Sequence, residues 1–78
     1  MATVNLFYFG SVTDITGISS EETDSPETLE ELNEMLQVRY PKLAGNSYRF
    51  SVNRKLITGN RQLIDGDEIA LLPPFAGG

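Results

Sequence analysis

The last six residues of the chain, Pro73 to Gly78, have the composition best suited to chemistry. Gly77 and Gly78 carry no side chains, so the terminal carboxylate can enter a channel too narrow for any other residue. Pro73 and Pro74 favour a stiff, extended backbone, and six residues reach at most about 20 Å. The sequence therefore predicts a probe that presents the Gly78 carboxylate to a partner, with an ordinary frayed terminus as the alternative.

A terminal carboxylate has a pKa of about 3.5, so at neutral pH it is an anion and a poor electrophile. It must be activated before it reacts, for example by adenylation with ATP. The chain has neither a GxxxxGK[ST] loop nor a GxGxxG loop, so a partner enzyme must supply the ATP site and its Mg²⁺. Sulfide, a persulfide or an amine can then attack the activated acyl group. We expect no cofactor on this chain.

Other catalytic groups are almost missing from the chain. It has no Cys and no His, which excludes disulfides, thiolate or imidazole zinc sites, a Cys nucleophile and a Ser-His-Asp triad. Asp65, Asp67 and Glu68 are close in sequence, but the further ligands of a calcium loop are absent. We expect these three residues to form a turn that enters a strand, and we predict no metal site.

The composition is that of one small folded domain: 78 residues, 40% apolar and 22% charged. The net charge of −5, from 6 basic and 11 acidic residues, makes nucleic acid an unfavourable partner. No apolar run approaches the length of a membrane span, and no signal-peptide pattern opens the chain. A cytoplasmic protein is the default expectation.

The opening segment predicts a strand over residues 4–9, rich in β-branched and aromatic side chains. Alternation places Val4, Leu6 and Tyr8 on one face and leaves Phe7 and Phe9 on the other. Both faces are largely apolar, so the second face needs a cover or a partner. A short helical turn over 12–17 and a polar edge strand over 18–23 follow.

The clearest pattern is an amphipathic helix that ends at Pro41. Ser25 is suited to the N-cap and Pro26 to the first helical position. One face then carries the apolar residues Leu29, Leu32, Met35, Leu36 and Tyr40. The opposite face carries Glu27, Glu30, Glu31 and Glu34. This acidic row could form a recognition surface, but we expect a solvated helix face, whose early glutamates favour the positive N-terminal dipole.

Three further strands are predicted after the helix, over residues 48–53, 56–57 and 68–72. Asn53-Arg54 and Asp65-Gly66-Asp67 are typical of turns, and Pro73-Pro74 stops the last strand. One helix on one face of a mixed sheet is an α+β two-layer fold. We expect one domain over residues 1–72 and an extended tail over 73–78.

The run from Asp65 to Gly78, DGDEIALLPPFAGG, closely resembles the C-terminal signature of the molybdopterin synthase small subunits. These are the MoaD-type members of the ubiquitin-like ThiS/MoaD group of sulfur carriers. The resemblance extends more weakly over the whole chain and implies a ubiquitin-like β-grasp fold. The Leu72-Pro73-Pro74 run is more similar to the molybdopterin type than to the thiamin-pathway carrier, which also ends in Gly-Gly.

This resemblance implies a mechanism. A partner resembling ubiquitin-activating enzymes adenylates the Gly78 carboxylate, which is then converted to a thiocarboxylate. The tail, residues Pro73, Pro74, Phe75, Ala76 and Gly77, enters the large synthase subunit of a heterotetramer. There the thiocarboxylate donates sulfur to cyclic pyranopterin monophosphate in molybdenum cofactor biosynthesis. Acid and base residues then belong to the large subunit, and this chain has no independent activity.

The sequence also suggests a docking surface on the face away from the helix, made of Phe7, Phe9, Leu72 and Phe75. Phe75 departs from the family, which has a smaller aliphatic residue there, and this bears on how the tail fits its channel. Arg49 and Arg54 could pair with acidic partner groups, although isolated arginines usually face solvent. Three alternatives to a synthase subunit remain open: a ubiquitin-like modifier joined through Gly78, a sulfur carrier for another pathway such as thiamin, and an interaction domain whose tail is incidental.

Overall fold

The structure is a computed structural model that describes residues 2–74. It begins with strand β1 (Ala2–Tyr8), helix α1 (Ser11–Thr16), strand β2 (Ser20–Ser25) and helix α2 (Leu29–Arg39). It continues with the 3-10 helix η1 (Pro41–Gly45) and strands β3 (Arg49–Val52), β4 (Lys55–Ile57) and β5 (Glu68–Leu72). The predicted order of strands and helices is confirmed, and β5 lies at the predicted residues.

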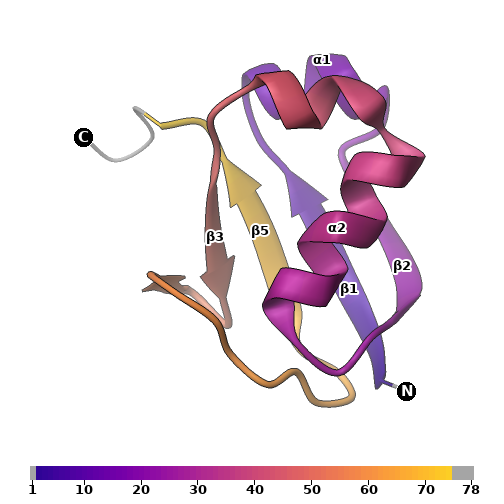
Figure 1. Cartoon of the computed structure of the whole chain (residues 1–78), viewed down its shortest axis with the longest axis vertical. Coiled ribbons are helices and arrows are strands. Elements are labelled where there is room, and N and C mark those ends of the chain that lie inside the picture. The colour runs from indigo at the N-terminus through magenta and orange to yellow at the C-terminus, as the bar shows by residue number, and fades with distance from the viewer. Residues whose placement is uncertain (1, 75–78) are drawn as a thin grey trace.

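The strands form one mixed sheet in the order β2-β1-β5-β3-β4. The central strands β1 and β5 run parallel, whereas β2 pairs with β1, and β3 with β5 and β4, in antiparallel fashion. Helix α2 crosses one face of this sheet, as Figure 1 shows. The predicted α+β fold, a mixed sheet with one main helix on one face, is confirmed.

The hydrophobic core lies between the sheet and α2. Val4, Leu6 and Tyr8 of β1 are buried, as predicted from their alternation. The core also contains Val12, Leu29, Leu32, Leu36, Leu43, Val52, Leu63, Ile69 and Leu71. Since neighbouring side chains on a strand point to opposite faces, Phe7 and Ala70 project from the face opposite α2.

The predicted start of α2 at Ser25 and Pro26 is wrong. Strand β2 continues to Ser25, which pairs with Ala2 and is fully buried, so its backbone follows the sheet. Thr28 is the N-cap instead, and its hydroxyl accepts the backbone N–H of Glu31 at 3.2 Å. Of the acidic row, Glu30, Glu31 and Glu34 are exposed on α2, as a solvated helix face requires, while Glu27 precedes the helix.

Edge strand β2 is held to the rest of the fold by Glu21. Its Oε2 atom accepts hydrogen bonds from the hydroxyls of Tyr8, at 2.5 Å, and Tyr40, at 2.7 Å. Arg39 of α2 forms an ion pair with the same carboxylate at 3.4 Å. Burial, and then the bond to Glu21, raises the pKa of both tyrosines. A strand of poor propensity is therefore fixed by side-chain contacts.

Other boundaries differ from prediction by one or two residues. The edge strand lies at 20–25 instead of 18–23, and the third strand at 49–52 instead of 48–53. The short helix α1 ends at Gly17 with a left-handed φ of 78°, as expected for a glycine cap. Within residues 2–74 no helix is long and apolar enough to cross a membrane.

Candidate functional site

The tail leaves the sheet at the end of a central strand. β5 ends at Leu72, and the backbone N–H of Phe9 donates to the carbonyl of Leu71 at 3.2 Å. Pro73 is half-buried and passes over Gly10, where a methyl group would lie 2.6 Å from the Pro73 Cγ atom. Gly10 thus leaves room for Pro73. This first tail residue, the root of the tail, is packed on the fold.

The reactive end of the predicted tail lies outside the described residues. Phe75, Ala76, Gly77 and Gly78 belong to this part, so their assignment stays a prediction. Pro74 is described and is exposed. The division into a domain over 1–72 and a tail over 73–78 also remains a prediction, although the last strand ends at Leu72.

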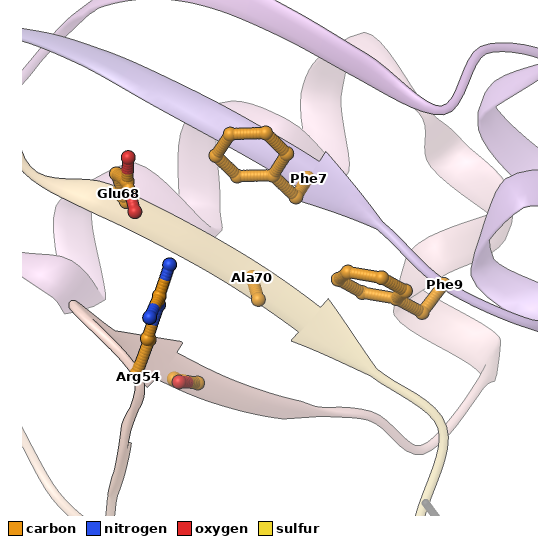
Figure 2. A pocket seen from close by; sticks show the side chains of 6 residues that line it. Phe7, Phe9, Arg54, Glu68 and Ala70 are labelled. Atoms are coloured by element: carbon orange, nitrogen blue, oxygen red, sulfur yellow. The ribbon is translucent and has the colours of Figure 1, made fainter.

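The face opposite α2 contains a hollow of about 330 Å³. Phe7 on β1 pairs in register with Ala70 on β5, and Ala70 pairs with Ser51 on β3. Two small side chains therefore stand side by side on the neighbouring strands β5 and β3 and form the floor. Phe9, Arg54 and Glu68 complete the lining. Figure 2 shows the two aromatic rings on the β1 side and Arg54 directed from the other side toward Glu68.

Arg54 belongs to a tight turn between β3 and β4. Val52 and Lys55 are paired, so Asn53 and Arg54 form a two-residue loop, and their φ angles are 51° and 71°. Two successive positive φ angles are typical of a type I′ hairpin. The predicted turn is confirmed, and it holds Arg54 in a conformation that favours glycine.

The side chain of Asp67 holds this turn in place through hydrogen bonds. Its carboxylate is buried and accepts a hydrogen bond from the Asn53 side chain and one from the backbone N–H of Ile64, both at 2.9 Å. Asp65 accepts the backbone N–H of Thr3 at 2.8 Å. The acidic trio therefore serves the turn that enters β5, as expected. Residues 2–74 contain no cluster of acidic side chains that could hold a metal ion.

The predicted docking residues lie together only in part. Phe7 and Phe9 both line the hollow, and Phe9 is 48% exposed. Leu72 pairs with Arg49 one step closer to the tail and does not line the hollow. Ser51 and Glu68 were not predicted as lining residues, because their contribution depends on which strands are neighbours. The alternation in residues 48–53 could have placed Ser51 on this face.

Comparison with known proteins decides the family. The model described as the ThiS family matches residues 6–78. The chain belongs to the ThiS family. Among curated relatives, the human molybdopterin synthase sulfur carrier subunit is 34% identical, with 96% of this chain and 93% of the relative covered. The subunit of the same name from Mycobacterium tuberculosis is 35% identical over the full length of both chains.

Solved structures agree with this ThiS family fold. A protein–protein complex of subunits 1 and 2 of molybdopterin-converting factor from Helicobacter pylori contains a chain that is 30% identical. It has a TM-score of 0.74, and the match covers 97% of this chain and 99% of the other. Small archaeal modifier protein 1 from Methanosarcina acetivorans has a TM-score of 0.84 at 24% identity, covering 100% and 98%. This second match supports the fold alone. The predicted β-grasp fold is confirmed.

Proposed function

We propose that this chain is a sulfur carrier that serves as the small subunit of molybdopterin synthase. The observation that carries the proposal is the placement of the tail root. Leu72 ends a central strand, Pro73 follows it directly and is packed on Gly10, and Phe9 beside them lines an open aromatic hollow. A short tail that ends in Gly77 and Gly78 can reach into a partner while the hollow docks against it. The relatives named as sulfur carrier subunits support the same role.

The proposed chemistry takes place on the main-chain carboxyl of Gly78. A partner enzyme resembling ubiquitin-activating enzymes transfers AMP from Mg·ATP to this carboxylate and releases pyrophosphate. A sulfur nucleophile, a sulfide or an enzyme persulfide, attacks the acyl carbon and displaces AMP. When a persulfide attacks, its S–S bond is then cleaved by a thiol or other two-electron reductant of the partner system, which leaves the thiocarboxylate. The thiocarboxylate sulfur then passes to cyclic pyranopterin monophosphate, and water restores the Gly78 carboxylate.

The large synthase subunit is the proposed second partner. The Helicobacter pylori structure is a complex of subunits 1 and 2 of molybdopterin-converting factor. It supports an assembly of this chain with a large subunit. We propose that Phe7, Phe9, Leu72 and Phe75 contact the large subunit, with the tail inserted in its active site. The catalytic acid and base residues then belong to the large subunit.

Intact-mass analysis tests this function. The full chain is incubated with the activating enzyme, Mg·ATP and a sulfur donor. The expected result is the mass gain of one oxygen replaced by sulfur, located on Gly78. A chain that lacks Gly78 is expected to gain no mass while it keeps the same unfolding transition, and a reaction without ATP is the second control. Conjugates of the chain with lysine residues of other proteins, without a sulfur gain, would favour the ubiquitin-like modifier. Transfer of the sulfur into thiazole formation alone would favour a thiamin-pathway carrier.

A further inference from the structure

The turn at Arg54 combines an unfavourable backbone with a well-placed side chain. Arg54 has a φ of 71° in the second position of a two-residue hairpin, where glycine is strongly preferred. Nothing in the hairpin itself requires an arginine at this position. The guanidinium lines the hollow and points across it toward Glu68, as Figure 2 shows. An unfavourable backbone conformation that places one side chain on an open surface indicates a role in recognition.

The charge of Arg54 has no partner within the described chain. Among residues 2–74, the ion pair present joins Arg39 to Glu21, and no carboxylate lies within 4.0 Å of Arg54. The chain as a whole carries a net charge of −5. Arg54 shares the lining of the hollow with Glu68 but forms no ion pair with it. Its guanidinium is therefore available to an anionic group that has an apolar neighbour.

The shape of the hollow restricts the occupant further. Its floor is made of Ala70 and Ser51, one methyl and one hydroxymethyl group, and the aromatic rings of Phe7 and Phe9 stand beside it. An apolar side chain that projects from a partner can fill this space. A second copy of this chain would carry the same net charge of −5, so the two copies would repel each other overall.

We propose that Arg54 is a specificity-determining residue of the docking surface and binds a carboxylate of the large synthase subunit. An apolar side chain next to that carboxylate fills the hollow between Phe7 and Ala70. The hollow is continuous with the root of the tail through Phe9, whose backbone is bonded to Leu71. Docking at Arg54 therefore fixes the register at which the tail enters the partner. This inference rests on the proposed function.

Lys55 is a matched control for Arg54. The two are neighbours in sequence and both are exposed, and replacing either with glutamine removes one positive charge. However, Lys55 pairs with Val52, whose side chain is in the core, so Lys55 points to the opposite face of the sheet. A general effect of net charge acts on both positions, whereas a specific contact acts on Arg54 alone.

The experiment measures the affinity of the full chain for the purified large subunit of the same organism by isothermal titration calorimetry. We expect Arg54→Gln to weaken binding about tenfold, the loss of one charge-assisted hydrogen bond, and Lys55→Gln to change it less than twofold. Arg54→Gly should weaken binding equally while its Tm stays the same or rises, because glycine suits the turn. Equal effects of Arg54→Gln and Lys55→Gln would overturn the proposal.

Failure of the proposed function can be distinguished from failure of the proposal about Arg54. If the wild-type chain does not bind the large subunit at all, the proposed function fails first, and the inference about Arg54 falls with it. Sedimentation velocity on the chain alone is expected to show a monomer. A dimer that Arg54→Gln dissociates would overturn the proposal and assign the hollow to a second copy of the chain.

Discussion

The side chain of Asn53 donates a hydrogen bond to the carboxylate of Asp67 at 2.9 Å and ties the β3–β4 turn to the start of β5. The same carboxamide accepts the backbone N–H of Glu68 at 2.9 Å, and the Asn53 N–H donates to the Glu68 carbonyl at 2.8 Å. Because Arg54 follows directly, this connection also fixes the backbone from which the Arg54 side chain reaches the hollow. A structural contact on the turn therefore supports the surface proposed for docking.

Replacing Asn53 with glycine tests this connection. Glycine tolerates the φ of 51°, so the variant removes the side-chain hydrogen bonds without backbone strain. We expect the free energy of unfolding in urea to fall by about 2–3 kcal/mol, because the buried Asp67 loses a donor and Glu68 loses an acceptor. Arg54→Gly, in the adjacent position of the turn, should cost nothing. Equal stability of the two variants would show that the Asn53 side chain does not hold the turn.

The packing of α2 on the sheet is tested by two substitutions in one helix. Leu36 is fully buried in the core, whereas Val38, two residues later, is 82% exposed. We expect Leu36→Ala to lower the free energy of unfolding by about 3 kcal/mol and Val38→Ala to change it by less than about 0.5 kcal/mol. Chemical denaturation followed by circular dichroism measures both. A small effect at Leu36 would contradict the core assignment.

The sequence predicted what depends on local patterns. Alternation in residues 4–9 placed Leu6 in the core and Phe7 on the opposite face, because a strand has a strict period of two. The start of α2 was missed because pairing of Ser25 with Ala2 extends β2, and this long-range contact outweighs a favourable capping residue. Thr28, with Glu31 three residues later, is also a capping signal.

The hollow could be predicted only in part. Phe7 and Phe9 were predicted on the open face, but Ser51 and Glu68 join them through the sheet order β1-β5-β3. Neighbouring strands that are far apart in sequence cannot be inferred from periodicity. The resemblance to ThiS/MoaD carriers predicted the fold, which is confirmed, and the tail, which stays a prediction. The proposed role of Arg54 depends on backbone angles seen only in three dimensions.

The tyrosines at edge strand β2 predict a loss of stability at alkaline pH. The pKa of Tyr8 is raised far above its ordinary value of 10.0, by burial first and then by the hydrogen bond to Glu21. The folded state keeps this phenol protonated when the unfolded state releases the proton. The contribution of Tyr8 is therefore complete below pH 10 and is lost as the pH rises toward the folded pKa.

Urea unfolding of the wild type between about pH 8 and 11, a range that includes the pKa of an unfolded tyrosine, measures this effect. Tyr8→Phe should be about 1–2 kcal/mol less stable at neutral pH, because Glu21 loses a buried donor. Its stability should then decline less steeply above pH 10, where the wild type begins to lose the contribution of Tyr8. An identical pH dependence of the two proteins would contradict this assignment of the alkaline transition.

The aromatic side of the hollow is tested by comparing two exposed apolar residues. Phe9 lines the hollow next to the tail root and is 48% exposed, whereas Ile64 is 63% exposed in the loop that precedes β5. Since β1 and β5 are parallel, Phe9, just after the end of β1, and Ile64, before the start of β5, lie at opposite ends of the sheet. Replacing either with serine should leave the unfolding transition almost unchanged, because both side chains are on the surface.

Their effects on assembly should differ. Phe9→Ser is expected to weaken binding to the large synthase subunit by at least about tenfold, because aromatic side chains at the centre of an interface carry much of the binding energy. Ile64→Ser should keep the wild-type affinity. The double variant Phe9→Ser with Arg54→Gln should be weaker than either single variant, since the two side chains line the same hollow from opposite sides. Wild-type affinity of Phe9→Ser would move the docking surface away from this face of the sheet.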